Sequence, residues 1–160
     1  MKAKSALITT LALLALNAPS NASAASPLLE FSNGNQIYGS TLAISSTGKI
    51  THTERNCCPP HTDPVREKQL TAADLSHLKR LITAAAKARV LDHEGAPTSE
   101  GSTAGELAAN VGKKKIVIYR IERASPDGGH NKVSVNQAPE AALIKKLVEG
   151  YVKVPFDANN

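Results

Sequence analysis

Two stretches of the chain alternate apolar and polar residues with the two-residue period of a β-strand. Residues 37–45 form the first, and residues 49–55 form the second, in which Ile50 and His52 fall on the same face. A short turn that contains a glycine separates them. This pattern predicts a β-hairpin with one face toward the core and the other toward solvent.

Apolar residues recur at helical spacing in two later segments, residues 71–89 and 139–153. Thr71 can accept a hydrogen bond in the first turn of the earlier segment, and Asp74 completes a capping-box-like pair with it. Pro139 suits the first turn of the later segment, because its missing N–H is not needed there. We therefore predict two helices over these ranges.

Three further strands are predicted between the helices, over residues 106–111, 114–123 and 132–136. Residues 91–105 are rich in Gly, Ser and Thr and are interpreted as a long loop. The loop includes Asp92-His93-Glu94, which we interpret as the solvated exit of the first helix.

Together these elements predict an α+β domain with the order β-β-α-β-β-β-α. Its antiparallel sheet has about four to five strands, and both helices pack on one face, because each helix has a single apolar stripe to bury. The predicted domain covers residues 37–154. Residues 25–36 are interpreted as a loosely held N-terminal arm, and residues 155–160 as a tail.

The start of the chain has the pattern of a signal peptide. Lys2 and Lys4 precede an uncharged, mostly apolar run over residues 6–16, and Ala22-Ser23-Ala24 fits the small-residue cleavage pattern. We expect residues 1–24 to be cleaved and the protein to be periplasmic or secreted in a bacterium. No other segment is apolar enough to predict a membrane span.

The amino-acid composition limits the kinds of molecule that the protein is expected to bind. Aromatic residues make up 3% of the chain, so the core must be aliphatic and base-stacking platforms for nucleic acid are scarce. The formal net charge is +5, which falls to about +3 without Lys2 and Lys4. No nucleophile elbow, zinc-protease helix or phosphate-binding loop occurs. We expect a protein partner, no nucleic acid, no cofactor and no enzymatic activity.

Both cysteines of the chain, Cys57 and Cys58, are neighbours, and Pro59, Pro60 and His61 follow. Adjacent Cα atoms lie about 3.8 Å apart, below the usual disulfide range of about 4.4–6.8 Å. The pair therefore forms either a strained vicinal disulfide or free or intermolecularly bonded thiols. In either case the prolines limit the loop to extended or turning conformations, and Pro59, Pro60 and His61 are candidates for a rigid contact loop.

A metal site is the sharper hypothesis for the same loop. His52, Cys57, Cys58 and His61 could supply two imidazoles and two thiolates, a set that suits zinc or copper. The adjacent cysteines lack the two-residue gap typical of zinc sites, which weighs against it.

The layout resembles that of small exported bacterial proteins, in particular the emfourin-type inhibitors of thermolysin-like metalloproteases. The resemblance covers residues 37–153 and rests on element order and on the helix pattern L-T-A-A-D-L-S-H-L-K-R-L-I of residues 70–82. It includes no diagnostic motif, and the cysteine loop departs from it. It implies a non-enzymatic binding protein that inhibits a secreted protease. The alternative is a metal-binding or redox protein of the cell envelope that uses Cys57 and Cys58.

Overall fold

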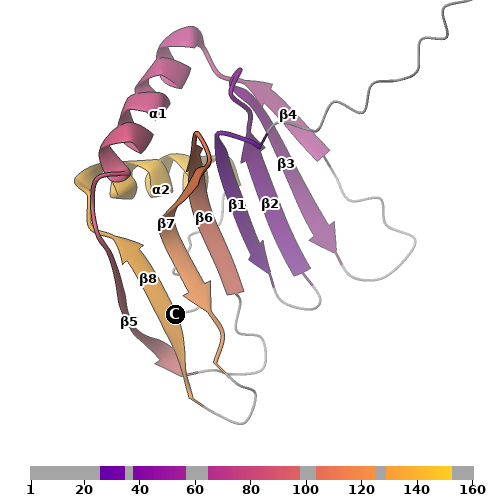
Figure 1. Ribbon diagram of the computed structural model, residues 1–160. Helices are drawn as coiled ribbons and strands as arrows, with labels where there is room; N and C mark the ends of the chain where they lie inside the picture. The colour runs from indigo at the N-terminus through magenta and orange to yellow at the C-terminus, as the bar shows by residue number, and fades with distance from the viewer. Residues whose placement is uncertain (1–25, 35–37, 57–64, 98–103, 125–128, 153–160) are drawn as a thin grey trace, which may run out of the picture.

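The computed structural model describes residues 26–34, 38–56, 65–97, 104–124 and 129–152. In these ranges the chain forms eight strands and two helices, which Figure 1 shows from one side. In chain order they are β1 (Leu29–Gly34), β2 (Tyr38–Ile44), β3 (Lys49–Asn56), β4 (Val65–Gln69), α1 (Ala72–Ala85), β5 (Val90–Pro97), β6 (Ala104–Val111), β7 (Lys114–Glu122), β8 (His130–Asn136) and α2 (Pro139–Val152).

All eight strands belong to one antiparallel sheet with the order β4-β3-β2-β1-β6-β7-β8-β5. Two meanders, β1-β2-β3-β4 and β6-β7-β8, are joined by the pairing of β1 with β6. Leu29 therefore faces Ile44 on one side and Ala109 on the other. The edges of the sheet are β4, beside β3, and β5, beside β8.

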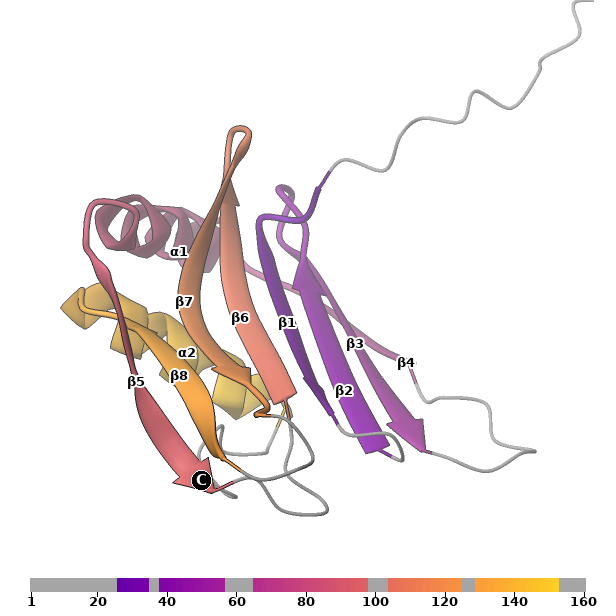
Figure 2. The same cartoon turned by 60° about the horizontal axis from the view of Figure 1, so that its bottom comes forward.

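Both helices lie against the same face of the sheet, as the two views in Figures 1 and 2 show. We call this the helix-covered face and the other the open face. Leu78 and Ile82 of α1 and Ile144 and Val148 of α2 are almost completely buried in the core. Leu, Ile, Val and Ala supply nearly all of the core, as the low aromatic content predicts.

The predicted sheet of four to five strands, with the order β-β-α-β-β-β-α, is wrong, because the sheet has eight strands. β1 lies in the predicted N-terminal arm, β4 in the predicted crossover after the cysteines, and β5 in the predicted long loop. Every residue of β4 is exposed, so this strand has no apolar alternation to reveal it. β5 contains Gly95 and Pro97, which are usual signs of a loop.

The predicted helices are present with nearly the predicted bounds. The Oγ1 of Thr71 accepts a hydrogen bond from the backbone N–H of Asp74 at 3.1 Å, so the predicted N-cap is confirmed. The second helix begins at Pro139 as predicted. The first helix ends at Ala85 rather than Arg89, because the chain turns there into the unpredicted strand β5.

Candidate functional site

His52 of β3, a predicted metal ligand, is buried with 4% of its surface exposed. Its Nε2 atom lies 2.8 Å from the Oγ of Ser40 on β2. The same nitrogen lies 4.0 Å from Oε1 of Glu54, and Arg66 of β4 lies 3.5 Å from that oxygen. The cluster thus links three neighbouring strands on the helix-covered face.

This cluster does not have the geometry of a catalytic triad. In a triad the serine and the carboxylate contact different ring nitrogens, so that the acid orients the base. Here Ser40 and Glu54 both lie nearest Nε2 of His52. The hydroxyl of Ser40 gives the buried imidazole of His52 a hydrogen-bond partner inside the sheet. This arrangement does not activate Ser40 as a nucleophile.

The other predicted site residues, Cys57, Cys58, Pro59, Pro60 and His61, lie outside the described residues. Asn56 is the last described residue before them, about 13 Å along the strand from His52 at the usual rise per residue. Within the described ranges, no group of three or more His, Cys, Asp or Glu side chains could hold a metal ion.

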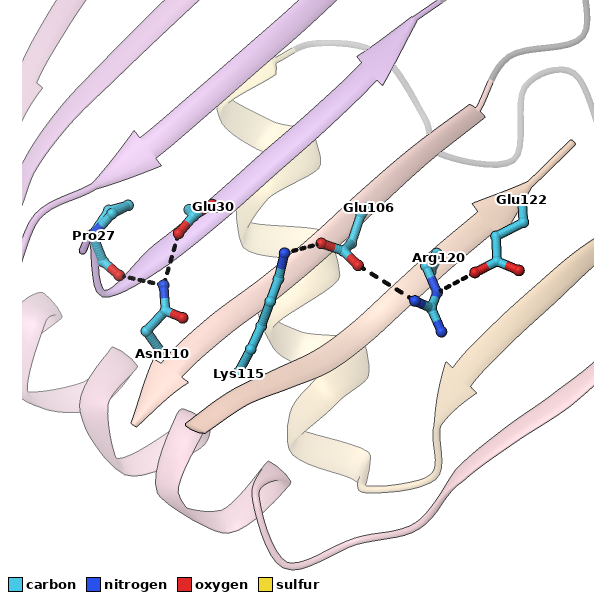
Figure 3. Close-up of polar contacts among 7 residues, drawn as sticks. All are labelled: Pro27, Glu30, Glu106, Asn110, Lys115, Arg120 and Glu122. Atoms are coloured by element: carbon cyan, nitrogen blue, oxygen red, sulfur yellow. Dashed lines mark hydrogen bonds and ion pairs between the residues drawn. The ribbon is translucent and has the colours of Figure 1, made fainter. Parts of the chain in front are cut away.

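The open face carries a charged cluster that the sequence analysis did not anticipate (Figure 3). Glu106 of β6 forms ion pairs with Lys115 and with Arg120, whose Nη1 lies 3.8 Å away. Arg120 also forms an ion pair with Glu122 at 3.2 Å, although no hydrogen-bond geometry is met at its Nε. Two acids and two bases balance here, so this cluster fastens β6 to β7 rather than attracting a charged ligand.

A second polar contact on the open face ties the edge strand β5 to β8. The hydroxyl of Ser134, which is fully buried, donates a hydrogen bond to Oδ1 of Asp92 at 2.6 Å. Lys132 lies 2.9 Å from the other carboxylate oxygen. The bond from Ser134, followed by that from Lys132, lowers the pKa of Asp92 below its ordinary value of 3.8.

A hollow of about 600 Å³ lies on the helix-covered face, between α2 and the strands β7, β8 and β5. Its sheet side includes the apolar Ile118 and Val133 and the polar Asn136, and Ala142 of α2 lines it from the helix. His93 and Glu94 of β5 and Lys145 of α2 add polar groups to the lining. The size and the mostly apolar lining with a few polar groups are typical of ligand-binding sites.

The Lys145 ammonium group in this hollow lies over the ring of Tyr119, 4.4 Å from its centre. At that distance the cation is attracted to the negative face of the ring. Lys145 also lies 4.0 Å from Glu149, one helical turn later. These contacts hold the lysine at the boundary between the hollow and solvent.

The edge strand β5 borders the hollow and exposes backbone hydrogen-bonding groups. The N–H of Gln137 donates to the carbonyl of Arg89 at 2.9 Å, so Arg89 points its backbone groups toward β8. Antiparallel pairing alternates this direction along the strand. The backbone N–H and C=O of Val90, Asp92 and Glu94 therefore point outward from the sheet, where no described strand follows.

The sequence does not reveal this edge, because Asp92-His93-Glu94 after a predicted helix favours a solvated helix exit. The structure places these residues in β5, with His93 opposite the buried Val133 and Asp92 opposite Ser134. Alternate residues therefore face opposite sides of the sheet. The exposed apolar pair Val90-Leu91 before them was the available signal of a strand.

Comparison with protein-family models and with the sequences of characterised proteins found no match to this chain. None of the helices in the described ranges is long and apolar enough to cross a membrane. Any assignment of function must therefore come from the geometry of the chain itself.

Proposed function

We propose that the protein is an exported, non-enzymatic binding protein that takes an extended segment of a partner protein as an additional strand beside β5. The outward-pointing backbone groups of Val90, Asp92 and Glu94 carry this proposal. Added strands bind through main-chain hydrogen bonds and gain specificity from pockets for alternate side chains. β5 has such a pocket beside it.

The contrast between the two sheet edges supports the choice of β5. The exposed edge strand β4 carries the consecutive charges Arg66, Glu67 and Lys68, which discourage pairing with another chain. β4 exposes one large apolar residue, Val65, at 57%, whereas β5 exposes two neighbours, Val90 at 40% and Leu91 at 50%, before its acids Asp92 and Glu94. Apolar side chains on a strand edge favour pairing, so the apolar pair makes β5 the edge better suited to a partner.

A secreted protease is the partner that the resemblance to emfourin-type inhibitors suggests. Inhibition would follow if the segment bound along β5 belonged to the protease. Incubation of the mature protein with secreted metalloproteases and serine proteases tests this version. If the proteases cleave a reporter substrate at the same rate with a large excess of this protein, the protein is not their inhibitor. That result would not contradict binding of a strand at β5, which the peptide experiment tests separately.

The peptide experiment uses short capped peptides of threonine and glutamate with one central leucine, and it measures binding by fluorescence anisotropy. We expect N-methylation of one alternate set of peptide amides to abolish binding and methylation of the other set to have little effect, because a strand bonds its neighbour through every second residue. Equal effects of both sets, or no binding by any peptide, would contradict strand addition.

A matched pair of variants tests the protein side. Val90→Pro removes an outward N–H that the sheet does not use, which an edge strand tolerates. Val90→Thr keeps that N–H and the β-branched shape. We expect Val90→Pro to weaken peptide binding about tenfold and Val90→Thr to bind as the wild type does. Equal binding by both variants would show that the peptide does not pair with β5.

A further inference from the structure

The hollow is lined on its β5 side by a residue without a side chain. Gly95 lies on β5 and lines the hollow, and a Cβ atom added there would lie 2.7 Å from Cγ2 of Val133. Position 95 therefore contributes no side chain to the β5 border of the hollow, and the side chain of Val133 lies against it instead. His93 and Glu94 are the side chains of β5 that line this border.

We propose that the hollow accepts one large apolar side chain, leucine or phenylalanine, of an acidic segment that pairs with β5. This inference rests on the proposed function and names the chemistry of its partner. Every second side chain of an added strand points to the helix-covered face. Diagonal neighbours across strands lie about 7–8 Å apart, within reach of such side chains.

The lining of the hollow explains the apolar part of this preference. Val133 and Val135 form its floor, and Ala142 of α2, opposite them, leaves room for an added group. A volume of about 600 Å³ is large enough for a leucine or phenylalanine side chain. A polar side chain would lose its water there and find few partners, so the hollow discriminates against it.

Charge explains the acidic part. Lys145 borders the hollow, and the chain without residues 1–24 carries a formal net charge of about +3. On the open side of β5, the acids Asp92 and Glu94 already have partners in Lys132 and His130. A carboxylate beside the apolar side chain would thus meet the ammonium group of Lys145, while Glu94, which also lines the hollow, has its own partner in His130.

A variant that fills the hollow tests the apolar part. Ala142 is exposed to solvent, so Ala142→Leu occupies the hollow without disturbing the core. Ala73→Leu, on an exposed position of α1, is the matched control. The probes are the leucine-centred peptide and the same peptide with alanine at its centre.

We expect the wild type and Ala73→Leu to bind the leucine peptide at least about tenfold more tightly than the alanine peptide. In Ala142→Leu this preference disappears while the alanine peptide still binds. Equal binding of both peptides by the wild type would overturn the side-chain site and leave strand addition intact. Failure of both peptides to bind the wild type would overturn the proposed function itself.

The charged part has its own comparison. A peptide with glutamate beside the central leucine should bind the wild type several-fold more tightly than the glutamine version, and Lys145→Gln should reduce that ratio. Equal affinities for the two peptides would contradict an acidic partner.

A second copy of the chain is the competing occupant of β5. Analytical ultracentrifugation distinguishes the two. If the wild type sediments as a dimer and Val90→Pro as a monomer, β5 pairs with a second copy of the chain and not with the proposed partner.

Discussion

The buried hydroxyl of Ser134 donates a hydrogen bond to Asp92 across the last strand pair of the sheet, at 2.6 Å. This contact, with the ion pair from Lys132, fixes the edge strand β5 from its open face. On the helix-covered face the same strand borders the hollow. The proposed binding edge is therefore held by its backbone ladder to β8 and by these polar contacts.

The order of β5 should depend on pH through Asp92. Because its folded pKa lies below the ordinary 3.8, ionised Asp92 contributes stability above that pH, and this contribution is lost as the pH falls through the folded pKa. Amide hydrogen exchange on β5 should be unchanged between about pH 7 and pH 5, once corrected for intrinsic rates, and faster below about pH 4. Asp92→Asn should remove this extra acid sensitivity of β5, and its persistence in that variant would assign it to another group.

Ser134→Ala should loosen β5 at neutral pH. The variant removes the hydrogen bond that contributes most to the lowered pKa of Asp92, so the pKa should rise toward its ordinary value. Exchange of the β5 amides should become faster while that of the α1 amides stays unchanged. Ser76→Ala, on an exposed position of α1, is the control. Uniformly faster exchange across the protein would instead indicate global destabilisation.

Gly95→Ala should destabilise the protein by about 1–3 kcal/mol, because the added methyl group overlaps Val133 and lies 3.2 Å from the backbone oxygen of Asn131. Gly150→Ala provides the opposite case. No atom lies within 4 Å of its added Cβ, and alanine favours the helix, so stability should rise by about 0.5–1 kcal/mol. Thermal unfolding checks both. Equal melting temperatures would show that the strand shifts freely at Gly95.

Ser40→Ala should cost about 1–3 kcal/mol, because it leaves the buried Nε2 of His52 without its hydroxyl partner. Denaturant unfolding measures the loss, and Ser46→Ala in an exposed turn should change stability by less than about 0.5 kcal/mol. Peptide binding at β5 should be unaffected, since this cluster lies near the opposite edge. Weaker peptide binding by the folded variant would indicate coupling between the two edges.

Phe31→Ala in β1 should cost about 3–5 kcal/mol, the usual range for truncating a buried aromatic residue. Ser32→Ala, exposed on the same strand, should have little effect. Chemical denaturation distinguishes them. If the two variants are equally stable, β1 is a loosely held arm, as predicted from the sequence, and not a central strand of the sheet.

The elements that could be predicted are those whose signals are local. Thr71 and Asp74 mark a helix start by themselves, and the alternation around Ile50 marks a strand. β4 has no such signal, because its charged residues are held by a ladder to β3 rather than by burial. β1 alternates over only a few residues, and one of its two strand partners, β6, comes from a distant part of the chain.

The site was less predictable than the fold for the same reason. The shared face of Ile50 and His52 follows from the strand period, whereas the hydroxyl that His52 contacts lies twelve residues earlier. The hollow exists only because α2 is placed over β8, which no local pattern predicts. In the sequence Gly95 suggests a loop, whereas in the structure the contact with Val133 explains why this strand position is a glycine.

The position of β1 has a consequence for folding. β1 is the first described strand of the chain, yet Leu29 must pair with Ala109, which is made much later. Until then one side of β1 is an unpaired strand edge with an apolar face. The two halves of the sheet can each form from nearby segments, but closing the long loop between β1 and β6 costs entropy and slows assembly. Pairing of β1 with β6 should therefore be a late step in folding. Until it occurs, the unpaired edge of β1 is the part of the folding chain that is most prone to aggregation.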